Sequence, residues 1–319
     1  MARIWANYGI DSLSIDLNFY DRHFYDHVFL DNQYEWYNGR TYQDVYAING
    51  YDGYDDLILA LGGHGFRFDS RGTVAGGTVT GLLESVYDGD DLWWAQDFSV
   101  SAVSLYKVGL TYGNADDRTL LSSIMAGADT INLSAHDDRF EGWGGDDQMW
   151  GNGGHDRLFG GTGNDMLNGG LGNDRLVGEG GNDRLIGAVG HDVLEGGSGV
   201  DLMEGGLGRD MMFAGLDSMR DVFVFRASMD TAVGSQRDQI HQFRPGQDDI
   251  DLSLIDANVA RAGNQAFAFA GTTAAAHAVW YAKAAGGVIV RGDLNGNKTA
   301  DFEIWVDDAT RVAATDFIL

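Results

Sequence analysis

The chain has 319 residues, with 48 acidic against 21 basic side chains, a formal net charge of −27 and no cysteine. This length allows two or three domains, and the acid excess argues against nucleic acid or an anionic membrane surface as a partner, because phosphate binding needs a basic face. The lack of cysteine excludes disulfides and a thiol nucleophile, and no stretch reaches the ~20 apolar residues of a membrane span.

Residues 1–123 are predicted to form a mostly-β domain that is crowded with aromatic side chains. Strand-like runs occur at 65–69 and 77–81, and aspartates lie between the aromatics. The aromatic residues fit either of two roles. They form a core, or they form an exposed platform for sugar rings or for a neighbouring protein.

Nine-residue units follow, eight of them back to back over residues 142–213 without an insertion. Every unit has Gly at its first and fourth positions, Asp at its sixth and Leu or Met at its eighth. Self-similarity at a fixed period is typical of a solenoid. The sixth-position residues are Asp147, Asp156, Asp165, Asp174, Asp183, Asp192, Asp201 and Asp210.

The repeat itself predicts a tight turn followed by a short strand. The two glycines indicate backbone angles that a Cβ would obstruct, and the last three residues of each unit can extend. The eighth residue, such as Leu158 or Leu194, is then expected to point inward, while Arg157 points outward. Turns stacked at the roughly 4.8 Å strand spacing would bring bare carboxylates together. Calcium suits carboxylate and carbonyl oxygens, and it suits them better than magnesium does.

These units resemble the RTX, or haemolysin-type calcium-binding, nonapeptide repeat. The resemblance implies a parallel β-roll in which two nonapeptides make one coil and repeat n shares ions with repeat n+2. Eight repeats then give 8 − 2 = 6 shared sites, so about six or more calcium ions are expected. It also implies that each sixth-position Asp gives side-chain oxygens, and that the second and fourth positions give carbonyls. The fourth-position residues are Gly145, Gly154, Gly163, Gly172, Gly181, Gly190, Gly199 and Gly208.

Departures from the pattern fall at position two and at the ends of the array. Position two holds Trp143, Asn152, Glu179 and Ala188 in four units. Residues 124–132 keep Asp129 and residues 133–141 keep Asp138, so two capping coils are predicted and the β-roll domain is placed at 124–213. Around Asp55 and Asp91 the same spacing recurs singly, which indicates irregular coils with further calcium or plain acidic turns.

Residues 214–319 are predicted to form a C-terminal capping domain, resembling a β-sandwich, with strands separated by Gly- and Asn-rich turns. The D-x-F-x-F run at Asp221, residues 243–253 and the terminal D-F-I-L resemble the C-terminal domain of serralysin-type proteases, which implies capping and export. Residues 293–301 favour a hairpin turn over an EF-hand, because Gly296 lies at loop position four and Ile304 at position twelve.

Export outside the classical route is the prediction for localisation. The first residues lack an apolar core followed by a small-residue cleavage site. Residues 315–319 resemble the uncleaved C-terminal signal of type I secretion substrates. A secreted, extracellular or cell-surface protein that uses the type I secretion machinery is therefore expected.

No catalytic motif is found: H-E-x-x-H and G-x-S-x-G are absent, and His23 and His27 have the i, i+4 spacing without a Glu. The chain is therefore predicted not to be an enzyme. It is predicted to be a calcium-binding structural, assembly or adhesion component of the cell surface or matrix. The alternatives are an exported polysaccharide- or protein-degrading enzyme, and a glycan-binding module in residues 1–123.

Overall fold

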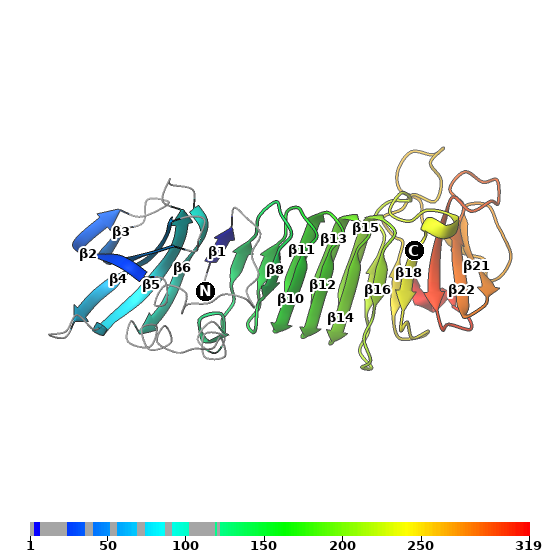
Figure 1. The fold of residues 1–319 in the computed structure, drawn as a ribbon. Coiled ribbons are helices and arrows are strands. Elements are labelled where there is room, and N and C mark those ends of the chain that lie inside the picture. The colour runs from blue at the N-terminus through cyan, green and yellow to red at the C-terminus, as the bar shows by residue number, and fades with distance from the viewer. Residues whose placement is uncertain are drawn as a thin grey trace. The chain divides into compact units, whose positions relative to one another are not determined.

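The computed structural model describes six N-terminal strands by their backbone, together with Thr119 and every residue of 122–319. It divides into two compact units, Met1–Gln148 and Met149–Leu319. Across the described residues the chain is nearly all β, as predicted (Figure 1). No helix among them is both long and apolar enough to cross a membrane.

The first unit contains an antiparallel sheet. Strands β2 to β6 pair in chain order, and β1 lies between β6, to which it is antiparallel, and β7, to which it is parallel. The strands are β1 (Arg3–Ala6), β2 (Phe24–Glu35), β3 (Thr41–Tyr51), β4 (Asp56–Phe68), β5 (Val74–Val86), β6 (Asp91–Ser101), β7 (Thr130–Asn132) and β8 (Arg139–Glu141). The expectation of irregular solenoid coils is therefore wrong over β2 to β6. Strands that follow each other in the chain pair antiparallel there, whereas the coils of a solenoid stack in parallel.

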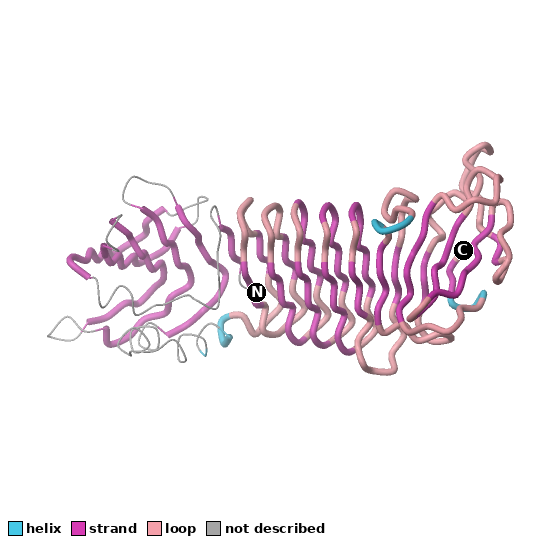
Figure 2. The backbone as a smooth tube through the Cα atoms, turned by 45° about the vertical axis from the view of Figure 1, so that its right-hand side comes forward, coloured by secondary structure: helices cyan, strands magenta, loops and turns pink. Residues whose placement is uncertain are grey.

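The second unit is a parallel β-roll whose strands alternate between two sheets (Figure 2). One sheet runs β11-β13-β15-β17-β19-β24, and the other contains β10-β12-β14-β16-β18. The repeat strands are β10 (Arg157–Thr162), β11 (Met166–Leu171), β12 (Arg175–Gly180), β13 (Arg184–Gly190), β14 (Val193–Ser198), β15 (Leu202–Gly208) and β16 (Met211–Phe213); β9 (Gln148–Trp150) lies at the division between the units.

Pairing within the roll links residues 18 apart, so two nonapeptides make one coil. Leu158 pairs with Leu176, and Leu167 with Leu185. Most repeat strands are six or seven residues long, running from position seven into positions one to three or four of the next unit. They are longer than the three residues predicted, since the first-position glycine does not break the extension.

The core is one thin column filled by the eighth residue of each unit. All eight of these side chains are fully buried, at 0 % exposure: Met149, Leu158, Leu167, Leu176, Leu185, Leu194, Met203 and Met212. Arg157 and Arg175 are exposed beside them, as strand alternation requires. One apolar layer per coil buries little area, so the roll needs another source of cohesion.

Parallel pairing continues past the last repeat. β15 pairs with β17 (Val222–Val224), and β16 pairs with β18 (Asp238–His241). Strands β19 (Asp249–Asp251) and β24 (Phe317–Ile318) then extend the first sheet. The second sheet ends in antiparallel strands, namely β21 (Ala278–Ala284), β22 (Gly287–Gly292) and β23 (Phe302–Asp307), with β20 (Ala268–Phe269) at its edge.

The loop between β22 and β23 confirms the hairpin. Asp293 accepts backbone N–H bonds from His277, Asn295, Gly296 and Lys298. Burial opposes ionisation of this carboxyl, but the N–H donors outweigh it and lower its pKa. The carboxylate therefore tightens the turn with main-chain donors.

Candidate calcium site

The corners of the roll are built from left-handed backbone. All eight fourth-position glycines have positive φ, between 114° and 155°. A Cβ at Gly172 would overlap the carbonyl oxygen of Gly154 in the coil before. Only glycine combines that φ with that close approach, so each fourth-position carbonyl lies against the same position of the next coil on.

Position two also has positive φ, which explains what it tolerates. The four residues that depart from glycine there have φ of 64°, 70°, 73° and 79°, and they are Trp143, Asn152, Glu179 and Ala188. A side chain fits this left-handed well at a cost of roughly 1–2 kcal/mol. The position therefore varies without changing the path of the backbone.

The first-position glycine is required by space rather than by φ, which corrects the expectation of an obstructed backbone angle. A Cβ at Gly178 would overlap both Asp183 Oδ2 and the carbonyl oxygen of Gly196. At Gly187 the overlap would be with Asp192 Oδ2 and the carbonyl oxygen of Gly205. At these positions, therefore, a carboxylate oxygen and a main-chain oxygen converge beside the first glycine.

The sixth-position aspartates form two hydrogen-bonded ladders, one along each edge of the roll. On one edge, the N–H of Asp174 donates to Asp192 Oδ1 at 2.8 Å, and that of Asp192 donates to Asp210 Oδ1 at 2.9 Å. On the other, the N–H of Asp183 donates to Asp201 Oδ1 at 2.8 Å. Each carboxylate is thus fixed by the backbone of the coil before it.

The second carboxylate oxygen has no such donor. In Asp183, Asp192, Asp201 and Asp210, Oδ2 is buried without a hydrogen-bond partner, and these residues are at most 2 % exposed. A buried acceptor left unmatched is costly, and a buried unpaired charge more so. Four unmatched carboxylate oxygens at the same position of successive repeats indicate that cations bind beside them.

The pKa values of these four aspartates are raised, mainly by burial. Burial raises the pKa of Asp192 to about 8; the N–H bond from Asp174 offsets part of this, and the neighbouring carboxylates of Asp210 and Asp174 add to it. Burial likewise raises the pKa of Asp183, Asp201 and Asp210 to about 7 each. A bound divalent cation would reverse this shift, because it favours the ionised form.

These donors fit calcium. Beside Gly178 and Gly187 a carboxylate oxygen and a carbonyl oxygen lie close together, and such oxygens are the hard ligands that calcium takes. No group of three or more His, Cys, Asp or Glu side chains gathers within the described residues. A cation on the ladder would therefore be held by few carboxylates and by main-chain carbonyls.

Three acids that the repeat pattern did not single out continue the ladders. Asp201 N–H donates to Asp221 Oδ1 at 2.9 Å, Asp210 N–H to Asp238 Oδ1 at 2.9 Å, and Asp221 N–H to Asp248 Oδ1 at 3.1 Å. Each precedes a buried apolar residue by two positions, as Asp precedes Leu or Met within the nonapeptide. That local spacing is the signal which could have identified them, since the 18-residue period is lost.

The aspartates of both frayed copies are hydrogen-bonded. Asp129 follows the ladder, because its N–H donates to Asp147 Oδ1 at 2.7 Å. Asp138 Oδ2 accepts from both the N–H and the hydroxyl of Ser134, at 2.9 Å each. Asp55 lies outside the described residues, and only the backbone of Asp91 is described; calcium at either stays a prediction.

The fifth position carries a second, exposed set of bonds. His155 Nδ1 accepts the N–H of Asn173 at 2.8 Å, and Asn173 Oδ1 accepts that of His191 at 2.8 Å. His191 Nδ1 accepts the N–H of Arg209 at 2.9 Å. The two histidines are exposed, and they also join neighbouring coils.

Comparison with known proteins agrees with this geometry. A family model for the RTX calcium-binding nonapeptide repeat (4 copies) matches residues 125–149, 150–185 and 177–212. No curated protein matches the chain. Among solved structures, the chain is similar to the AlgE6R3 subunit of the Azotobacter vinelandii mannuronan C5-epimerase. The identity is 27 %, over 49 % of this chain and 77 % of that one, with a TM-score of 0.21.

The fold and the acid ladders define a calcium-binding β-roll. Its repeats are RTX calcium-binding nonapeptide repeats, as the matched residues show. Which oxygens ligate each ion, including the predicted carbonyls of the second and fourth positions, stays a prediction.

Proposed function

We propose that the chain is a secreted RTX protein whose β-roll folds on binding calcium outside the cell and acts there as a structural, assembly or adhesion component. One observation carries this proposal. Buried Oδ2 atoms of successive coils lack a partner at Asp183, Asp192, Asp201 and Asp210. A roll with one apolar layer per coil does not offset that cost without cations.

Calcium supplies the opposite charge and the oxygen coordination that the ladders lack. The residues which would hold it are the sixth-position aspartates, with main-chain carbonyls at the corners. Folding and calcium binding are then one equilibrium, because the ladders exist only when the coils are stacked.

Export fits the same equilibrium. Weak calcium sites of the extracellular type have dissociation constants of about 10⁻⁴–10⁻³ M, so calcium fills them only where it is abundant. An acidic, Gly-rich segment without calcium has little to bury and stays unfolded. The C-terminal residues that resemble a type I secretion signal support the same route. In the folded chain, Phe317 and Ile318 pair with β19.

The test is far-UV circular dichroism and particle size of the full chain in millimolar calcium and in excess chelator. We expect chelation to remove most of the β-signal of residues 124–213, and calcium but not magnesium to restore it. A spectrum unchanged by chelator would contradict calcium-coupled folding. Electron microscopy in calcium would test assembly, and particles that stay single with and without calcium would count against that role.

The second candidate is a glycan-binding or glycan-acting region in residues 1–123, favoured by the aromatic side chains of that segment. A glycan array and a panel of polysaccharides, both assayed with the full chain in calcium, would separate it from a structural role. Binding or cleavage of one glycan class would favour the second candidate.

A further inference from the structure

One step of the ladder lies beyond the matched repeats and has the geometry of the steps within them. The N–H of Asp210 donates to Asp238 Oδ1 at 2.9 Å, the distance found between Asp192 and Asp210. The two acids are 28 residues apart instead of 18. The inserted chain therefore leaves the roll and returns to it in register.

Strand pairing fixes that register independently of the acids. Met211 pairs with Gln239 and Met212 with Ile240, in parallel. Ile240 is fully buried, as the eighth residues of the repeats are. Asp238 thus occupies the sixth position of a coil whose sequence does not read as a nonapeptide.

The two carboxylates are buried and lack compensation. Asp210 and Asp238 are each 0 % exposed, and Oδ2 of each has no hydrogen-bond partner. The adjacent Arg237 does not supply the charge, because its Nη2 is bound to Glu303 Oε2 at 2.6 Å. Two carboxylates in this setting need a cation between coils.

We propose that Asp210 and Asp238 hold a calcium ion in a terminal site outside the nonapeptide repeats. The proposal rests on the calcium-binding function proposed for the roll, and it adds a site that the repeat period does not predict. Calcium is the cation because the unmatched atoms are carboxylate oxygens.

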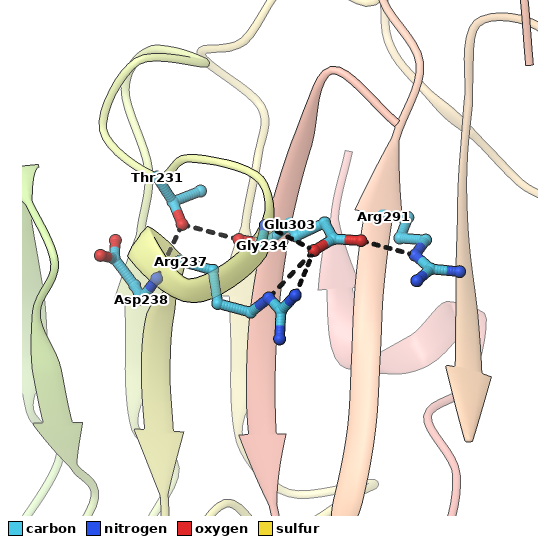
Figure 3. A network of polar contacts seen from close by, with 6 residues as sticks. All are labelled: Thr231, Gly234, Arg237, Asp238, Arg291 and Glu303. Carbon is cyan, nitrogen blue, oxygen red and sulfur yellow. Dashed lines mark hydrogen bonds and ion pairs between the residues drawn. The ribbon is translucent and has the colours of Figure 1, made fainter. Parts of the chain in front are cut away.

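The ladder ends at this step. Asp238 N–H donates to the hydroxyl of Thr231 at 2.9 Å instead of to another aspartate, and that hydroxyl donates to the carbonyl oxygen of Glu303 at 2.7 Å. The Glu303 side chain accepts in turn from Gly234, Arg237 and Arg291 (Figure 3). In that view the carboxylate of Asp238 points away from the Glu303 cluster. The terminal site therefore lies directly beside the contacts that hold β23.

The experiment counts ions. Native mass spectrometry of the full chain in calcium is compared for wild type, Asp238→Asn and Asp249→Asn. Asp249 is also buried, and it is the matched control because Arg220 already neutralises it. We expect Asp249→Asn to keep the wild-type number and Asp238→Asn to bind at least one ion fewer. Equal numbers in the two folded variants would overturn the proposal.

Should Asp238→Asn not fold, a crystal of the wild-type chain grown in calcium decides the matter. An anomalous calcium peak about 2.3–2.6 Å from Asp238 Oδ2 supports the site, and its absence there overturns it. Ions between the repeats but none at Asp238 would refute the terminal site alone. No ions anywhere would refute the proposed function as well.

Discussion

Asp192 in the repeats and Glu303 in β23 are both buried, but their environments are opposite. On the ladders, Asp192 keeps one oxygen unmatched, and burial raises its pKa to about 8. Glu303 is also buried, but its pKa is lowered. Burial opposes ionisation there and is outweighed by the Gly234 N–H and by Arg291 and Arg237. A buried carboxylate with donors for its oxygens is stable in its charged form, whereas one whose second oxygen has no donor needs a bound cation.

The largest effect expected from this contrast is regional unfolding on chelation. At free calcium ten times the dissociation constant, each site adds about 1.4 kcal/mol to the free energy of unfolding. The loss of three such sites therefore changes the equilibrium between the folded and the unfolded roll on the order of 10³-fold. We expect amide hydrogen exchange of residues 149–213 to speed up accordingly, while β22 and β23 change less. Equal acceleration in both regions would erase the contrast.

Alanine substitutions at Gly181 and at Gly246 compare how closely the backbone is packed in the two regions. Gly181 has a φ of 136°, and a Cβ there would overlap the carbonyl oxygen of Gly163. Gly246, with a φ of 85°, has open space around it. We expect Gly181→Ala to cost more than about 3 kcal/mol of unfolding free energy in urea, and Gly246→Ala about 1 kcal/mol. Similar costs would mean that the coils are not stacked this closely.

Asp192→Asn and Glu303→Gln test whether calcium is what separates the two kinds of acid. Glu303→Gln weakens the bonds to Arg237 and Arg291, and we expect a loss of about 2 kcal/mol with or without calcium. Asp192→Asn removes an unmatched charge, so we expect a loss in calcium and none, or a small gain, in chelator. Thermal melts of both variants under both conditions give the answer. A calcium-independent loss for Asp192→Asn would contradict its place on a cation ladder.

The smallest effect expected is a reversal of pH dependence. Without calcium, the raised pKa values of about 7 for Asp183 and Asp201 and about 8 for Asp192 mean that the folded roll binds more protons than the unfolded chain. Any residual apo roll is therefore most stable below the unfolded pKa near 4, and it loses stability as pH rises through about 7–8.

In saturating calcium the sign changes, because calcium binds the deprotonated carboxylates and protons compete with it. We expect the melting temperature to rise by a few degrees between pH 5 and 8 in calcium, and any melt seen in chelator to move the other way. The same slope under both conditions would show that the ladders do not bind the ion.

Much of the roll could be predicted from the repeat. A nine-residue period with an apolar eighth position predicts inward-pointing Leu158 and Leu194, and both are buried. The coil of two units was implied by the resemblance to RTX repeats, and the pairing of residues 18 apart confirms it. The fourth-position glycines predicted the corners. The role of the first glycine was missed, because the sequence does not show that Asp192 Oδ2 fills the space beside Gly187.

What the sequence determined by itself is local and periodic: a strand and a corner every nine residues, one buried side chain per unit and one aspartate per corner. Each follows from Gly, Asp and Leu recurring at fixed spacing. Only the tertiary structure decided that the ladders run past the repeats to Asp221, Asp238 and Asp248. Insertions remove the period, and parallel strand pairing, which joins residues far apart in the chain, restores the register.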